Sequence, residues 1–132
     1  MTGLDTNIIV RYLMQDDPNL SPVATRIFEQ DLKPDEQGFV STVVVAELAW
    51  VLKRVYRLKA AQIDSVFEQL LRTDSLVVEA EGDVFAALTL SRNGVGSFAD
   101  AFIGLLAARA GCTTILTFDR GAAGLPGFAI AI

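Results

Sequence analysis

The sequence predicts an α/β protein, a three-layer sandwich in which helices flank a short, mostly parallel sheet of about five strands. Short apolar segments alternate with longer segments whose apolar residues recur at helical spacing. The strand candidates are apolar throughout rather than at every second position, which is typical of parallel strands covered on both faces. No linker, repeat or low-complexity tract divides the 132 residues, so we expect one domain over residues 1–132.

The first half of the chain is expected to hold two strands and three helices. Ser21 followed by Pro22 predicts a helix start, with serine as N-cap and proline in the first turn. That helix is expected to place Val23 in the core. The helix that carries Glu47 is expected to place Val55 there. The expected elements are a strand over about 1–4, a helix over 6–14, the helix from Ser21 toward 33–38, a strand over 38–40 and a helix carrying Glu47.

The second half continues the alternation and ends on an edge strand. Gly94 and Gly111 follow apolar helical patterns and are expected to end those helices. The expected elements are a helix over 60–73, a strand over 75–79, a helix over 83–94, a helix over 97–111, a strand over 112–118 and a last strand over 127–132.

The composition excludes several kinds of catalysis. The chain has no histidine, so Ser-His-Asp and Cys-His mechanisms and histidine-bound metals are excluded. Its one cysteine, Cys112, forms no internal disulfide and has no partner for zinc. The net charge of −5 argues against a simple electrostatic nucleic-acid binder, yet acids gathered around a cation would give the same balance.

The apolar segments of the chain are short. None approaches the roughly 20 residues that span a bilayer, and no basic region leads into a long apolar stretch at the N-terminus. We therefore expect no membrane segment, no signal peptide and a cytoplasmic location.

Four acidic residues stand where predicted strands end or the next helices begin. Asp5 and Asp119 follow strands, whereas Glu47 and Asp100 lie in the early part of helices. In open α/β sheets, sites form at the carboxyl ends of strands. We therefore expect these four side chains to approach one edge of the sheet.

Each acid also has a purely structural interpretation. Glu47 is the only charged residue between Phe39 and Leu52, and the alternative for it is a hydrogen bond to a backbone amide. Asp100 fits a capping box with Ser97, and Asp5 and Asp119 fit N-caps. The capping roles are compatible with metal binding, because one carboxylate can do both.

Carboxylates that lie close together repel one another, so a cation must neutralise them or some must bind protons. An oxygen-only set of ligands suits Mg²⁺ or Mn²⁺, which supports phosphodiester hydrolysis. Thr6, Asn7 and Thr117 stand beside the acids and are candidates for orienting a carboxylate or a water.

The pattern resembles the PIN domain family, particularly the VapC-type toxins of bacterial toxin–antitoxin pairs. The matching segments are LDTN at 4–7, VVVAELAWVL at 43–52, ADAFIGLLAARAGC at 99–112 and LTFDRGAAGLPGF at 116–128. They follow the family's order and cover essentially the whole chain.

The resemblance implies an endoribonuclease in which Asp5, Glu47, Asp100 and Asp119 hold Mg²⁺ or Mn²⁺. Asp5 and Asp100 are then expected as principal ligands, with Glu47 and Asp119 acting partly through water. A water activated by the metal would cut RNA and leave a 5′-phosphate and a 3′-hydroxyl. The resemblance also implies a homodimer and a cognate antitoxin protein as partner.

Two other functions remain open at this point. One is a catalytically silent PIN-like module for RNA binding or assembly, although retention of all four acids weighs against it. The other is a phosphatase of the haloacid dehalogenase type, which needs an aspartate where Asn7 stands.

A basic ridge of Lys53, Arg54, Arg57 and Lys59 follows the helix that carries Glu47. It is suited to guide RNA or to meet an acidic partner, and equally suited to a solvated helix end with cations at the negative pole of the dipole. Arg11 and Arg120 have two interpretations, contact with substrate phosphate and structural ion pairing. Trp50 is expected in the core, with a partner interface as the alternative.

Overall fold

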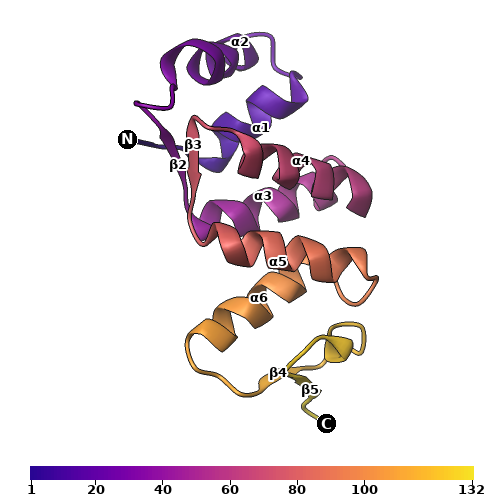
Figure 1. Cartoon of the computed structure of the whole chain (residues 1–132). Helices are drawn as coiled ribbons and strands as arrows, with labels where there is room; N and C mark the ends of the chain where they lie inside the picture. The colour runs from indigo at the N-terminus through magenta and orange to yellow at the C-terminus, as the bar shows by residue number, and fades with distance from the viewer.

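Helices and short strands alternate along the chain in the computed structural model, which describes residues 1–132 (Figure 1). The strands are β1 (Thr2–Gly3), β2 (Gly38–Val40), β3 (Leu76–Val78), β4 (Ile115–Thr117) and β5 (Phe128–Ile130). The α-helices are α1 (Thr6–Met14), α2 (Leu20–Arg26), α3 (Thr42–Arg54), α4 (Ala60–Arg72), α5 (Glu81–Arg92) and α6 (Phe98–Arg109). A π-helical turn follows α2 at Ile27–Asp31, and a 3₁₀ turn precedes β5 at Ala122–Gly124.

The α/β class and the five strands are confirmed, and every pairing between strands is parallel. The strands nevertheless lie in two sheets, β1-β2-β3 and β4-β5, rather than in one continuous sheet. β1 is an edge strand, and its outer side pairs with no other strand. The four acids were expected along one edge of one sheet. Because the strands form two sheets, this structure has no edge that all four acids share.

The two sheets are placed by different contacts. β1 pairs through only two residues, Thr2 with Gly38 and Gly3 with Phe39, so its ladder contributes few hydrogen bonds. β5 is placed instead by α6, because the Phe128 ring lies directly over Gly104, where an added Cβ would meet it at 2.6 Å. This contact packs the second sheet against α6.

The hydrophobic core lies around the first sheet and the helices that follow it. Ile9, Val40, Leu48 and Leu52 are fully buried, and Phe67 of α4 is 1% exposed. The core continues toward α6 through stacked rings, with centroid distances of 4.6 Å for Phe67–Phe98 and 5.7 Å for Phe98–Phe102. These rings join α4 to the first two turns of α6.

Figure 1 shows the termini at opposite ends of the molecule, with α5 and α6 between the two sheets. The β4–β5 end is much less covered than the core. Leu116 is 70% exposed and Phe118 is 77% exposed, although the sequence predicts a buried strand there. None of the helices is long and apolar enough to cross a membrane.

Most element boundaries agree with the predictions, and the start of α2 does not. α2 begins at Leu20, because the Asp17 carboxylate accepts hydrogen bonds from the backbone amides of Asn19 and Leu20. Ser21 lies inside the helix, where its hydroxyl donates to the Arg11 carbonyl at 2.8 Å. Val23 and Val55, both expected toward the core, are exposed.

Candidate functional site

The four acids stand at the predicted places in the chain, but the structure divides them between two cavities. Asp5 is the N-cap of α1, and Glu47 lies in the second turn of α3. Asp100 lies in the first turn of α6, and Asp119 follows β4. Asp5 and Glu47 line one cavity, whereas Asp100 and Asp119 line the other.

The first cavity, which we call the Asp5–Glu47 cavity, has a volume of about 390 Å³ and lies between α1 and α3. Asn7 also lines it, as does Thr6, whose hydroxyl is buried and has no hydrogen-bond partner. Glu47 is exposed and makes no hydrogen bond or ion pair, so the alternative of a bond to a backbone amide is not observed. Both carboxylates and the Thr6 hydroxyl are oxygen donors beside one hollow.

A network at the rim of this cavity fixes its only cation. The Arg11 guanidinium donates to the Asp16 carboxylate at 3.1 Å and to the Tyr56 hydroxyl at 3.3 Å. The Tyr56 hydroxyl in turn donates to Asp16 at 2.7 Å, and this bond, with help from Arg11, lowers the pKa of the Asp16 carboxyl. The structural interpretation of Arg11, an ion pair, is therefore observed. Tyr56 was not identified as a lining residue from the sequence.

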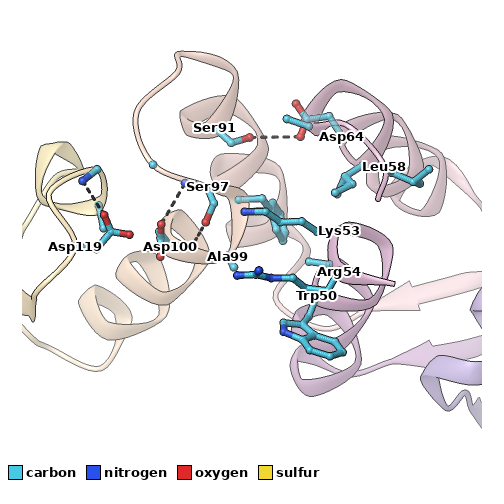
Figure 2. Close-up of a pocket in the computed structure, with 17 residues that line it drawn as sticks. Trp50, Lys53, Arg54, Leu58, Asp64, Ser91, Ser97, Ala99, Asp100 and Asp119 are labelled. Atoms are coloured by element: carbon cyan, nitrogen blue, oxygen red, sulfur yellow. Dashed lines mark hydrogen bonds between the residues drawn. The ribbon is translucent and has the colours of Figure 1, made fainter. Parts of the chain in front are cut away.

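The second cavity, which we call the Asp100–Asp119 cavity, has a volume of about 530 Å³ and lies between α3, α4, α6 and the loop after β4. Figure 2 shows Lys53 and Arg54 extending from α3 toward the start of α6, where Ser97 and Asp100 lie. Asp64 is the remaining acid of this lining; Arg92 pairs with it at 3.5 Å and the Ser91 hydroxyl donates to it at 3.4 Å. Asp64, Ser91 and Ser97 were not singled out as cavity residues.

The capping roles predicted for the acids are observed alongside their place in the cavities. The Asp5 carboxylate accepts from the Thr6 amide at 2.7 Å. The Ser97 hydroxyl and Asp100 carboxylate form a reciprocal capping box. Asp119 precedes a 3₁₀ turn and accepts from the Gly121 amide at 2.8 Å. Each of these carboxylates retains further lone pairs for a ligand.

The kind of donor in each cavity fits Mg²⁺ or Mn²⁺. Mg²⁺ is commonly held by one or two carboxylates, waters and the phosphate of a substrate. One cavity offers Asp5 and Glu47, and the other offers Asp100 and Asp119 beside Asp64, which is paired with Arg92. However, the structure brings no three Asp, Glu, His or Cys side chains close enough to hold one ion. The four acids therefore stand as two candidate pairs rather than as one centre.

The other candidate residues named from the sequence have different surroundings. Thr117 uses its hydroxyl to accept from the Asp119 amide at 3.0 Å, which orients the turn that carries this acid. Arg120 is exposed, makes no ion pair and lines neither cavity. Of the basic ridge, Lys53 and Arg54 line the Asp100–Asp119 cavity, and Arg57 and Lys59 do not.

Trp50 is 59% exposed and lies at the mouth of the same cavity, so the expectation of a core tryptophan is wrong. A usable signal was present in the spacing. Trp50, Lys53 and Arg54 stand at i, i+3 and i+4, which places them on one face of a helix. The core face of α3 is instead formed by Val45, Leu48 and Leu52.

An α/β fold with carboxylate pairs in its cavities and no histidine defines a class of candidate metal-binding proteins. Comparison with known families makes this specific: the PIN domain family matches residues 4–127, and the chain belongs to that family. The resemblance to VapC-type members is confirmed by a relative, the VapC ribonuclease of Aquifex aeolicus (strain VF5). It is 25% identical over 120 residues, which cover 91% of this chain and 88% of the relative. No solved structure matches the chain.

Proposed function

We propose that this protein is a metal-dependent endoribonuclease that hydrolyses RNA phosphodiester bonds and serves as the toxin of a toxin–antitoxin pair. The relationship to a VapC ribonuclease over nearly the full length is the main support. The PIN family match and the carboxylate pairs in two cavities agree with it. The absence of histidine excludes a route that depends on imidazole as acid and base.

We propose Asp5, Glu47, Asp100 and Asp119 as the metal ligands, with Mg²⁺ as the ion and Mn²⁺ as an alternative. The cation, when bound, would lower the pKa of the attacking water and offset negative charge on the phosphate. The carboxylates' task is to bind the cation and fix its position. The capping hydrogen bonds at Asp5, Asp100 and Asp119 would hold three of these side chains in place.

We further propose that the four carboxylates act as one centre when RNA and metal are bound. This requires the β4–β5 sheet to approach β1, whose outer edge has no strand beside it. The exposure of Leu116 and Phe118 favours such a movement, because apolar side chains that face solvent are stabilised by burial.

The proposed partners follow from the resemblance to VapC-type proteins. We propose a homodimer and a cognate antitoxin that covers the site, in the cytoplasm where the RNA substrate is found. Exposed apolar side chains offer surface for such contacts, because Val43, Phe85 and Ile103 are each more than half exposed.

The proposal is tested by incubating purified protein with total RNA, with Mn²⁺ or with EDTA, and mapping the fragment ends. We expect discrete fragments with 5′-phosphate ends from the wild type with Mn²⁺ only. Asp5→Asn is the matched control, because it removes one charge and keeps the shape of the side chain.

Fragments that are identical for wild type and Asp5→Asn would assign the cutting to a contaminant. No cutting by either protein, across transfer, ribosomal and messenger RNA, would instead support the catalytically silent module. The observation that supports this alternative is the separation of the four acids into two pairs.

A further inference from the structure

Two walls of the Asp100–Asp119 cavity carry opposite charges, and α4 forms part of the remaining lining. One wall is formed by α3 and presents Trp50, Lys53 and Arg54. The other is formed by the start of α6 and the loop after β4, and it presents the two acids (Figure 2). Its volume of about 530 Å³ lies within the range of roughly 300–1,000 Å³ that is usual for small-ligand sites.

Lys53 and Arg54 differ from most arginines of this chain because no acid pairs with them. Five arginines form ion pairs, namely Arg11, Arg26, Arg72, Arg92 and Arg109. Asp64 lines the same cavity but is already neutralised by Arg92 at 3.5 Å. The charges of Lys53 and Arg54 are therefore available to an anion that enters the cavity.

The position of the two cations at the end of α3 has a simpler explanation, the favourable interaction of a cation with the helix dipole. That interaction explains where they lie along the helix. It does not explain why both border a cavity whose opposite wall carries the proposed catalytic acids. Arg57 and Lys59, from the same basic ridge, are also exposed and unpaired but lie outside the cavity. They provide an internal comparison.

Trp50 completes the wall on the same helical face. Its indole is 59% exposed, and no other ring stacks on it. An exposed aromatic ring beside cations is the arrangement that proteins use for single-stranded nucleic acid, in which bases stack on the ring and phosphates contact the cations. A duplex keeps its bases stacked inside and presents no free face to such a ring.

We propose that this cavity is the site for single-stranded RNA, with a nucleobase stacked on Trp50 and a backbone phosphate held by Lys53 and Arg54. The neighbouring phosphodiester is then presented to Asp100 and Asp119. The inference rests on the proposed ribonuclease function and deepens it by naming the residues that bind and position the substrate. Trp50, Lys53 and Arg54 are positioning residues, and the hydrolysis itself belongs to the carboxylates.

The experiment uses the fact that Trp50 is the only tryptophan of the chain. The protein is titrated with a single-stranded 2′-O-methyl oligonucleotide while tryptophan fluorescence is recorded. One titration contains EDTA, and a separate one contains Ca²⁺ without EDTA. We expect a saturable change in emission from direct stacking on the indole. A self-complementary duplex of the same composition should produce a much weaker change.

The variants are compared by anisotropy of a fluorescein-labelled oligonucleotide, after circular dichroism has shown that each is folded. The double change Lys53→Ala, Arg54→Ala should weaken binding at least tenfold and reduce the slope of log K against log salt by about 0.7, the value for one phosphate contact on a single strand. The matched control Arg57→Ala, Lys59→Ala removes the same charge outside the cavity and should change binding little.

The ring is tested separately. Trp50→Ala should weaken binding about tenfold, and Trp50→Phe should restore most of the loss because a smaller ring still stacks. Equal losses in the two charge variants would overturn the proposal, as would an unchanged tryptophan emission. Equally tight binding of polyglutamate would overturn it too, because it would identify a general site for acidic partners.

The two proposals fail in different ways. Binding that depends on Trp50, Lys53 and Arg54 without metal-dependent cleavage would leave the RNA site standing and remove the ribonuclease function. Cleavage that is lost in Asp5→Asn but unchanged in the Trp50 and Lys53/Arg54 variants would leave the ribonuclease function standing and remove the proposed RNA site.

Discussion

Each of the two cavities contains a pair of proposed metal-binding carboxylates, but the cations near the two pairs are held differently. Both cavities border the buried core, the Asp5–Glu47 cavity through Thr6 and Val10 and the other through Ile63 and Phe98. In the Asp5–Glu47 cavity the cation, Arg11, is held by Asp16 and Tyr56. The Asp100–Asp119 cavity lies nearer the lightly covered β4–β5 end, and its cations Lys53 and Arg54 are unpaired. The comparison indicates that an anion would meet an already paired cation in the first cavity and two unpaired cations in the second.

The largest expected effect comes from removing one acid in each cavity. If the four carboxylates form one centre during reaction, Asp5→Asn and Asp100→Asn should each reduce RNA cleavage more than the roughly 10- to 100-fold typical of outer-shell changes. The double variant should then be no worse than either single variant, because residues that act as a unit are not additive. Initial rates with a fixed RNA and Mn²⁺ provide the measurement.

Additive losses would mean that the two cavities contribute separately. Full activity in one of the single variants would confine the chemistry to the other cavity, and it would remove the proposal of one shared centre.

The next effect compares packing in the two halves. Leu48→Ala should cost about 2–5 kcal/mol of unfolding free energy, because it leaves a cavity in the core, where Leu48 is fully buried. Leu116→Ala should change stability by no more than about 0.5 kcal/mol, because Leu116 is 70% exposed. Urea denaturation followed by circular dichroism measures both.

A large loss in Leu116→Ala would show that β4 is packed against the rest of the protein in solution. That result would bring the two sheets together and would favour the shared centre even without metal.

The smallest expected effect is the pH dependence of the contact between α5 and α6. Arg109 donates to the Asp83 carboxylate at 2.6 Å, and this hydrogen bond lowers the pKa of Asp83 below its ordinary value. A carboxyl whose pKa is lower in the folded state stabilises above its unfolded pKa, and the contribution is lost as pH falls through the folded pKa. The loss should therefore begin below about pH 4.

Asp83→Asn should be slightly less stable than the wild type at pH 7, and the difference should shrink as the pH is lowered past that point. Urea midpoints of both proteins between neutral pH and pH 3 check this. A difference that stays constant with pH would mean that the ion pair does not hold α6 on α5.

Much of the structure could be predicted from particular local patterns. The helix over 6–14 was predicted with its exact limits, because Asp5 caps it and its apolar residues recur at helical spacing. The capping box of Ser97 and Asp100 was likewise readable, since both partners lie within one turn. The start of α2 was misplaced because the Asp17 carboxylate accepts from the backbone amides of Asn19 and Leu20, so the helix begins before Ser21 with Asn19 as its N-cap.

The sequence by itself determined the α/β order of elements, the place of each acid at the end of a strand or the start of a helix, and the exclusion of histidine chemistry. These depend on local periodicity, capping and composition. Only the tertiary structure decided that the strands form two sheets and that Arg11 is paired while Lys53 and Arg54 are not. The physical reason is that these features depend on contacts between segments far apart in the sequence, such as Phe128 packing on Gly104. Local residue spacing does not specify such contacts.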